Sequence, residues 1–343
     1  MLAPGHPEAK ITASGTLPRA PKNCISSSLA VTVTVAIVTS CTQRKAGRHR
    51  VDVAVLPECA SLPRLAQAWR RAIGTASADM AAESLYQGRS IVDTAAAAAA
   101  LGAPWYVVSA GLGLIRHDQP VPAYECTVAA GTDLDRRLRA VGCHVPQWWN
   151  ALTETSPAPL SRLIAKAPTL LALPSGYLRL VQDDLAQVTP ARARSLRIFT
   201  SAAGVQCLPR HLQGCVMPYD DRLESVRGYA GTRSDFAQRA LRHFVEVLQA
   251  TDRQLEEAHE SVATALASRR RRQRSMGQRM TDDEILKVLK AQWSRHSGSS
   301  TRLLRYLRDE ARISCEQKRF SREDADQRGR LIFGHARHTF ERG

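Results

Sequence analysis

The stretch Trp105-Tyr106-Val107-Val108-Ser109-Ala110-Gly111 decides the fold class, because in it a short apolar run ends in three small residues. The same pattern occurs three more times, at residues 31–41, 169–176 and 196–202. Each run has the length and composition of a buried strand, and helix-like stretches separate the four runs. Strands that alternate with helices form parallel sheets. The sequence therefore predicts a three-layer α/β domain with a four-stranded parallel sheet.

The small residues that follow the strands indicate where a ligand would bind. In an open parallel sheet, ligands bind just beyond the carboxyl ends of the strands. Small polar residues at these ends let a flat or polar ligand approach the backbone closely. We therefore expect a base-binding pocket built from strand-end residues, namely Ser40, Cys41, Ser109, Gly111, Ser175 and Ser201.

The charge of the chain favours a nucleic-acid partner. Its 343 residues carry 48 Lys and Arg against 32 Asp and Glu, a formal net charge of +16, and the hydrophobic content of 44% excludes wholesale disorder. From Arg269 to the end, 20 basic residues stand against 10 acidic ones, so most of the excess lies in the last quarter. Such asymmetry is typical of a nucleic-acid-binding segment. A generally arginine-rich proteome is the alternative explanation.

The cysteines and the N-terminus favour the cytoplasm. The eight cysteines include no C-x-x-C pair, so we expect neither structural zinc nor a disulfide framework, and no other metal or cofactor. Residues 1–30 are rich in Pro, Gly and Ser and are expected to form a disordered extension. The alternating residues 31–35 that follow are typical of a strand and not of a signal peptide. No run is long enough for a transmembrane helix, so no membrane association is expected.

The chain divides into an α/β catalytic domain at 31–267, a basic linker at 268–280 and a helical nucleic-acid-binding domain at 281–343. In the first domain we expect single helices over 78–101 and 234–267. Thr281 is a good N-cap for the third domain, and a Gly-containing turn then leads into a basic helix. This pattern is typical of a helix-turn-helix. The expected DNA contacts are Arg269, Arg270, Arg271, Arg272, Arg302, Arg305 and Arg308.

The segment between Gly111 and Tyr124 is predicted to be a long irregular loop that carries the chemistry. Asp118, on a loop stiffened by nearby prolines, suits a carboxylate that activates water or stabilises a developing cation. His117 beside it is a second catalytic candidate. The alternative is that Asp118 caps a turn and His117 is solvated. Tyr124 and Glu125, which the prolines also hold, are further base-binding candidates.

Three residues outside that loop complete the expected site. Lys45 could steady a phosphate or a leaving group, so we count it with the catalytic residues. Tyr86 and Tyr177 could stack on a base, although core packing explains Tyr86 equally well. Cys41 is more typical of a structural residue than of a nucleophile.

Four short motifs carry a family resemblance over residues 31–225. They are Thr39-Ser40-Cys41-x-x-x-Lys45, Leu85-Tyr86-x-Gly88, Ser109-Ala110-x-x-Gly113-Leu114-Ile115 and Pro122-x-Tyr124. In this order they resemble an uncharacterised actinobacterial and phage domain family. That family is similar to the uracil-DNA-glycosylase-like domain of archaeal tRNA-guanine transglycosylases, whose first strand leads into Pro-Cys-Ser-x-x-Lys-Pro-Tyr. Here Thr39 stands in place of that proline, and the interval from that position to the lysine is one residue longer.

The resemblance extends to antiphage DNA glycosylases that remove glucosylated hydroxymethylcytosine. It implies a uracil-DNA-glycosylase-like fold and hydrolysis of an N-glycosidic bond in double-stranded, modified phage DNA. The water-activating motif Gly-Gln-Asp-Pro-Tyr of that superfamily is absent here, and Asp118 followed by Pro122-x-Tyr124 is a loose counterpart. Two other functions remain open: a tRNA base transglycosylase or nucleoside hydrolase, and a DNA-binding regulator without enzymatic activity.

Overall fold

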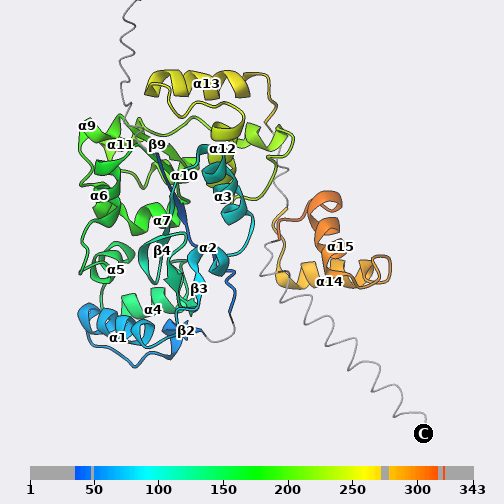
Figure 1. Cartoon of the computed structure of the whole chain (residues 1–343). Helices are drawn as coiled ribbons and strands as arrows, with labels where there is room; N and C mark the ends of the chain where they lie inside the picture. Colours follow the sequence, from blue (N-terminus) through cyan, green and yellow to red (C-terminus); the bar gives the residue numbers. More distant parts are fainter. Residues whose placement is uncertain (1–34, 48–49, 272–277, 316–319, 321–343) are drawn as a thin grey trace, which may run out of the picture.

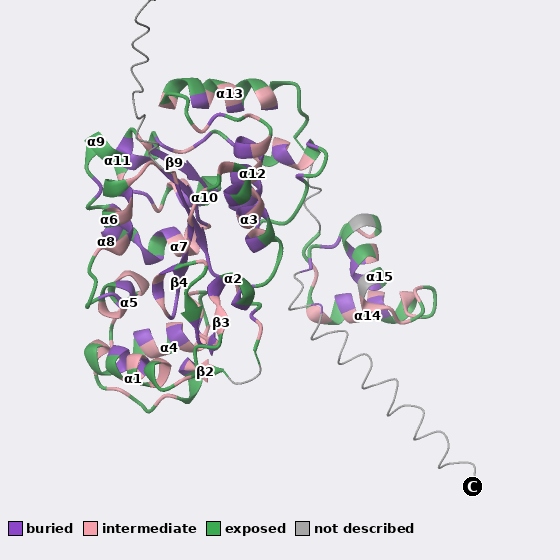
Figure 2. Cartoon of the chain, in the orientation of Figure 1, coloured by how far each residue is buried: buried purple, intermediate pink, exposed green. Residues whose placement is uncertain are grey.

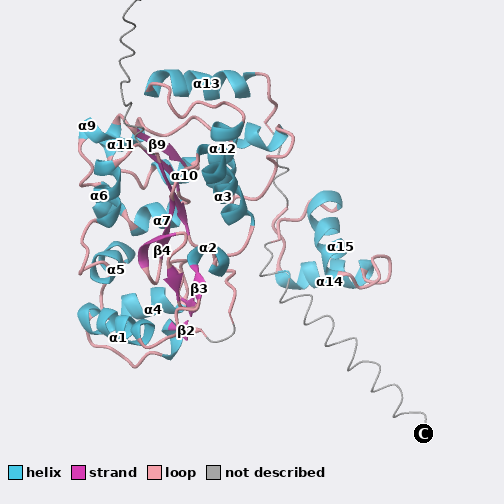
Figure 3. Cartoon of the chain, in the orientation of Figure 1, coloured by secondary structure: helices cyan, strands magenta, loops and turns pink. Residues whose placement is uncertain are grey.

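The computed structural model describes residues 35–47, 50–271, 278–315 and 320. Within these residues the mixed α/β fold is confirmed: one five-stranded sheet has the order β5-β4-β1-β8-β9. Four strands are parallel, and each coincides with one of the four apolar runs. Their bounds are β1 Ala36–Ser40, β4 Trp105–Ser109, β8 Thr169–Ala172 and β9 Leu196–Phe199. Figure 3 shows this sheet at the centre of the α/β body.

The prediction of a four-stranded sheet is wrong by one strand. β5 (Gly113–Arg116) turns back antiparallel to β4 and forms an edge of the sheet. The segment predicted as an irregular loop is therefore partly regular. It also contains β6 (Pro120–Val121), which pairs with β3 (Met80–Ala81), and β7 (Tyr124–Glu125), which pairs with β2 (Val51–Asp52). Gly113, with φ of +77°, permits the tight reversal that starts β5.

Helices cover both faces of the sheet (Figure 1). α3 (Arg89–Leu101) and α12 (Phe236–Glu246) pack against each other on one face. α5 (Val145–Leu152), α6 (Pro159–Lys166) and α7 (Ser175–Leu180) lie on the other. The strands between them are buried, as Figure 2 shows, because both faces exclude water.

The remaining elements surround this core. The longer ones are α1 Leu62–Gly74, α4 Asp133–Ala140 and α13 Leu255–Ala267. The short ones are η1 Val53–Val55, α2 Ala82–Leu85, α8 Gln182–Leu185, α9 Pro190–Ala193, α10 Ala202–Val205, α11 Arg210–Gln213 and η2 Asp221–Ser225.

Two expected helices are each interrupted. The helix expected over 78–101 breaks at Gly88, whose φ of +114° is a conformation that residues with a side chain rarely adopt. α2 therefore ends before it and α3 begins after it. The helix expected over 234–267 is two helices, because α12 ends at Glu246 and α13 begins at Leu255.

The C-terminal segment has a small apolar core of its own. α14 (Asp282–Gln292) begins with a capping box between Thr281 and Glu284, as the sequence indicates. α15 (Ser300–Arg305) follows and continues into a π-helical turn at Tyr306–Glu310. Ile285, Leu289, Leu303 and Leu307 are fully buried between these elements.

No helix in the described ranges is long and apolar enough to cross a membrane. The described cysteines are all free thiols. Residues 1–34, 272–277, 316–319 and 321–343, about which the sequence makes predictions, lie outside the described residues.

Candidate functional site

A cleft of about 480 Å³ opens at the carboxyl ends of β1 and β8. This is the point of the sheet where successive connections leave in opposite directions, since β4 lies on one side of β1 and β8 on the other. We call it the β1/β8 cleft. Its lining comes from the strand ends and from the starts of α3, α7 and α12, and consists of Ser40, Cys41, Thr42, Gln43, Gln87, Gly88, Arg89, Ser90, Thr127, Val128, Ala129, Pro174, Gly176, Tyr177, Ser234 and Asp235.

Three of the expected base-binding residues line the cleft: Ser40, Cys41 and Tyr177. The Cys41 thiol and the Tyr177 hydroxyl are 2.9 Å apart and join the end of β1 to the start of α7. Burial raises the pKa of the Tyr177 hydroxyl well above its ordinary value, so this group is a neutral hydrogen-bond partner near pH 7. Ser175 lies between two lining residues, on the first position of α7.

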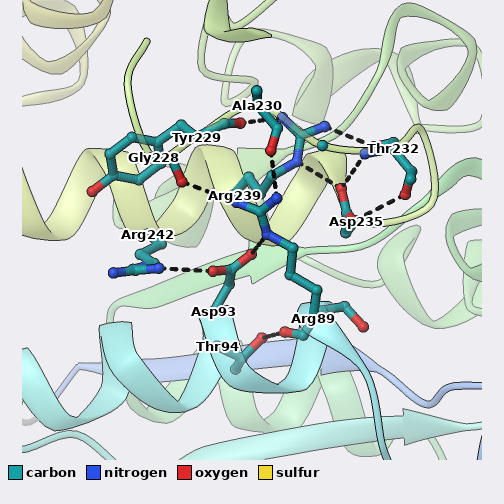
Figure 4. Close-up of polar contacts among 12 residues, drawn as sticks. Arg89, Asp93, Thr94, Gly228, Tyr229, Ala230, Thr232, Asp235, Arg239 and Arg242 are labelled. Carbon is teal, nitrogen blue, oxygen red and sulfur yellow. Dashed lines mark hydrogen bonds and ion pairs between the residues drawn. The ribbon is translucent and has the colours of Figure 1, made fainter.

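A network of arginines fixes one wall of the cleft (Figure 4). Arg89, on that wall, donates from its guanidinium to the carbonyls of Gly228 and Ala230 and pairs with Asp93 at 3.3 Å. Arg242 of α12 pairs with the other oxygen of Asp93 at 3.0 Å. Because each charge is matched, we assign Arg89 to the structure of the wall.

Arg239 is the buried centre of the same network and is fully shielded from solvent. Its Nε donates to Asp235 Oδ1 at 2.6 Å, and its Nη2 donates to Glu224 Oε1 at 2.9 Å and to the carbonyl of Thr232 at 2.7 Å. Its Nη1 donates to the carbonyl of Tyr229. The guanidinium thus ties the loop before α12 to the helix that follows it.

A second group of expected site residues meets at the carboxyl end of β4, beneath the surface. The Tyr124 hydroxyl lies 2.7 Å from Ser109 Oγ and 2.9 Å from the Tyr86 hydroxyl. All three residues are buried. Burial raises the pKa of both tyrosines well above the ordinary value, so the hydroxyls stay protonated. We call these three residues the hydroxyl cluster.

Lys45 packs onto the hydroxyl cluster. Its Nζ lies 4.6 Å from the centre of the Tyr124 ring and is buried without a hydrogen-bond partner among the described residues. The backbone of Lys45 forms a β-bridge with Tyr86, which explains why this lysine points inward from the loop after β1. A buried cation over an aromatic face adds positive potential beneath the strand ends.

The structure carries His117 and Asp118 away from the carboxyl ends of the parallel strands. Because β5 runs antiparallel to β4, its last residue Arg116 pairs with Tyr106 near the amino end of β4. A strand of this length moves the chain by roughly 13 Å. The His117 ring stacks on Trp105, and Asp118 is 47% exposed and pairs with Arg116 at 2.8 Å. The structure therefore does not bring this pair to the carboxyl ends of the parallel strands, where the sequence places them.

Three other candidates have structural contacts or lie elsewhere. A Cβ at Gly111 would come within 2.7 Å of the Tyr124 ring and 2.9 Å of Trp69, so close packing requires this glycine. Glu125 is half-exposed and pairs with Arg50 at 3.4 Å. Ser201 is exposed at the start of α10 and does not line the cleft.

The arginines that the sequence predicts to contact DNA differ in their surroundings. Arg269, Arg270, Arg302 and Arg305 are exposed, as a phosphate contact requires. Arg271 is also exposed and pairs with Asp220 at 3.1 Å. Arg308 is exposed as well, but it donates twice to the carbonyl of Cys315, which gives it a structural contact within the C-terminal segment.

Sequence reasoning missed the parts of the cleft that come from helix starts. Gln87, Ser90 and Asp235 each lie inside a stretch that the sequence predicts as continuous helix. Gly88 is the residue that could have revealed the first break. Thr232 and Asp235 are spaced as a helix-start pair, which could have identified the start of α12 as a polar, hydrogen-bonded turn.

The described residues include no group of three or more His, Cys, Asp or Glu side chains that could hold a metal ion. The polar part of the cleft lining instead consists of hydroxyls, amides, the Cys41 thiol, Arg89 and the carboxylate of Asp235. Such groups can hydrogen-bond to the edge of a base and orient a water molecule.

Comparison of the chain with protein-family models, with curated proteins and with solved structures found no match in any of the three.

Proposed function

We propose that this protein is a DNA glycosylase, which hydrolyses the N-glycosidic bond of a base in double-stranded DNA and leaves an abasic site. The observation that carries the proposal is the β1/β8 cleft, which has the size of a small-ligand site and a lining that combines neutral hydrogen-bonding groups with Arg89 and Asp235. A base that acts as substrate must leave the helical stack, and a cleft of this kind would receive it. Tyr177, which is partly exposed and lines the cleft, can stack on the flipped base.

The distribution of charge agrees with a duplex partner. The net charge of +16 and the exposed arginines of the C-terminal quarter suit contacts with phosphates that do not depend on sequence. The family resemblance adds that the base is modified, that the DNA comes from phage and that the enzyme acts in antiviral defence, and the cysteine pattern adds a cytoplasmic location. These finer points are part of the proposal.

The test is mass spectrometry of the bases that the full chain releases from phage DNA with modified cytosines, from ordinary duplex DNA and from tRNA. We expect a free base from DNA and none from tRNA. A base released or exchanged only in tRNA would favour a transglycosylase, and DNA binding without release from any substrate would favour a regulator.

A variant that fills the cleft links the activity to this site. Gly176 lines the cleft, its φ is not positive, and a Cβ there meets nothing within 4 Å. Gly176→Trp should therefore fold normally and abolish base release. Gly214→Trp is the matched control, because Gly214 has the same free space and does not line the cleft. Equal activity of the two variants would place the reaction elsewhere.

A further inference from the structure

The cleft needs a group that directs water at the sugar, and this inference rests on the proposed glycosylase function. Asp118 lies near the amino end of β4 and does not line the cleft. Glu125 and Asp220 do not line it either. Among the described residues that line the cleft, Asp235 is the single carboxylate.

The hydrogen bonds of Asp235 leave one of its oxygens able to bind water. Oδ1 accepts from Arg239 Nε at 2.6 Å and from the backbone N–H of Thr232 at 2.9 Å. Oδ2 accepts from Thr232 Oγ1 at 2.9 Å. A carboxylate offers about four acceptor positions, two on each oxygen. These three hydrogen bonds therefore use both positions on Oδ1 and one on Oδ2.

The surroundings hold this carboxylate in one orientation. Arg239 is itself fixed by Glu224 and by the carbonyls of Tyr229 and Thr232. Gly231 allows the arrangement, because a Cβ there would lie 2.5 Å from Arg239 Nε and 2.8 Å from Asp235 Oδ1. A fixed acceptor at the edge of a cleft is what alignment of an attacking water requires.

We propose that Asp235 is the catalytic residue that aligns the hydrolytic water, and that Arg239 is its positioning residue. The water oxygen bonds to C1′ while the bond from C1′ to the base nitrogen breaks and its electron pair leaves with the base. The proton lost by the water passes to Asp235 Oδ2 and on to solvent, and the departing base takes up a proton from solvent. The products are a free base and a sugar with a hydroxyl at C1′.

The chain offers a matched pair of carboxylates for the test. Asp235 and Glu224 both pair with Arg239, but only Asp235 lines the cleft. The experiment measures single-turnover base release, DNA affinity and urea unfolding for Asp235→Asn and Glu224→Gln in the full chain. We expect Asp235→Asn to slow release by roughly 100-fold or more with unchanged DNA affinity. Glu224→Gln should stay within a few-fold of the wild type.

A third variant keeps the test decisive if Asp235→Asn unfolds. Thr232 is exposed, and Thr232→Val removes only the hydroxyl that orients Oδ2. We expect it to slow release by roughly tenfold while the protein stays folded. Full activity of Thr232→Val or Asp235→Asn, or equal losses in Asp235→Asn and Glu224→Gln, would overturn the role of Asp235. If the wild type releases no base from any DNA, the glycosylase function itself fails.

Discussion

Replacing Arg239 by methionine tests whether the buried network holds the fold around the cleft. Arg239→Met preserves much of the side-chain length but leaves the carboxylates of Asp235 and Glu224 without their cation. The Glu224 and Asp235 side chains are 3% and 10% exposed, so water replaces the lost contacts poorly. Removing one partner of a buried ion pair costs about 3–5 kcal/mol. The carbonyls of Tyr229 and Thr232 lose a donor as well.

Urea unfolding at pH 7 measures this loss directly, and thermal unfolding gives a second measure. For a protein of this size a loss of 1 kcal/mol lowers Tm by about 2–4 °C, so we expect a fall of roughly 6–20 °C. Arg242→Met is the matched control on the same helix. The Arg242 side chain is 32% exposed and its partner Glu246 is 27% exposed, while its buried partner Asp93 keeps the ion pair with Arg89, so the loss of Arg242 should cost about 1 kcal/mol.

Removing the charges of the two carboxylates that pair with Arg239 should restore part of the stability that Arg239→Met loses. Asp235→Asn and Glu224→Gln, introduced together into Arg239→Met, leave no unpaired charge in this group and should recover part of the lost stability. A loss in Arg239→Met no larger than that in Arg242→Met would refute the view that this network is a buried, tightly paired unit.

Three further predictions concern the tail, the histidines and Asp118. Deletion of residues 269–343 should weaken DNA binding and flatten its dependence on salt, because the segment holds a surplus of ten basic residues; an unchanged salt slope in a filter-binding assay would contradict this. Burial lowers the pKa of His243 and His259 below the ordinary 6.5, so the unfolded chain takes up protons that the folded chain does not. The free energy of unfolding should therefore fall as pH drops from 7 to 5, by up to about 1.4 kcal/mol per pH unit for each histidine, and His243→Gln should reduce the slope in urea titrations. Asp118→Asn should leave base release unchanged, because this exposed carboxylate contacts Arg116 and not the cleft; a large loss of activity would restore its catalytic role.

Local sequence patterns were sufficient to locate the strands of the parallel sheet. The run Trp105–Ser109 forms a strand over the same residues, and the runs that begin at Thr169 and Leu196 form strands that start there. These segments are short, apolar and bounded by small residues, so their conformation depends little on distant contacts. The capping box at Thr281 was predictable for the same reason, since its partners are three residues apart.

The sequence also determined which residues gather near the carboxyl ends of the strands, but not the role of each. Ser40 and Cys41 follow β1 directly and line the cleft, as their position indicates. Tyr86 and Tyr124 meet Ser109 below the surface instead: Tyr86 pairs with Lys45 of the loop after β1, and Tyr124 lies in β7, which pairs with β2. No spacing rule distinguishes a buried hydroxyl from one that lines a cleft.

Only the tertiary structure decided which carboxylate lies at the cleft. The chain reverses direction at Gly113, and β5 then runs antiparallel to β4. Asp118, which follows β5, therefore lies toward the amino end of β4. Asp235 is distant in sequence from β1, yet the packing of α12 on α3 brings it to the strand ends. The pairing direction of an edge strand and the contacts between distant helices depend on the burial of whole faces. Local residue order therefore does not specify them.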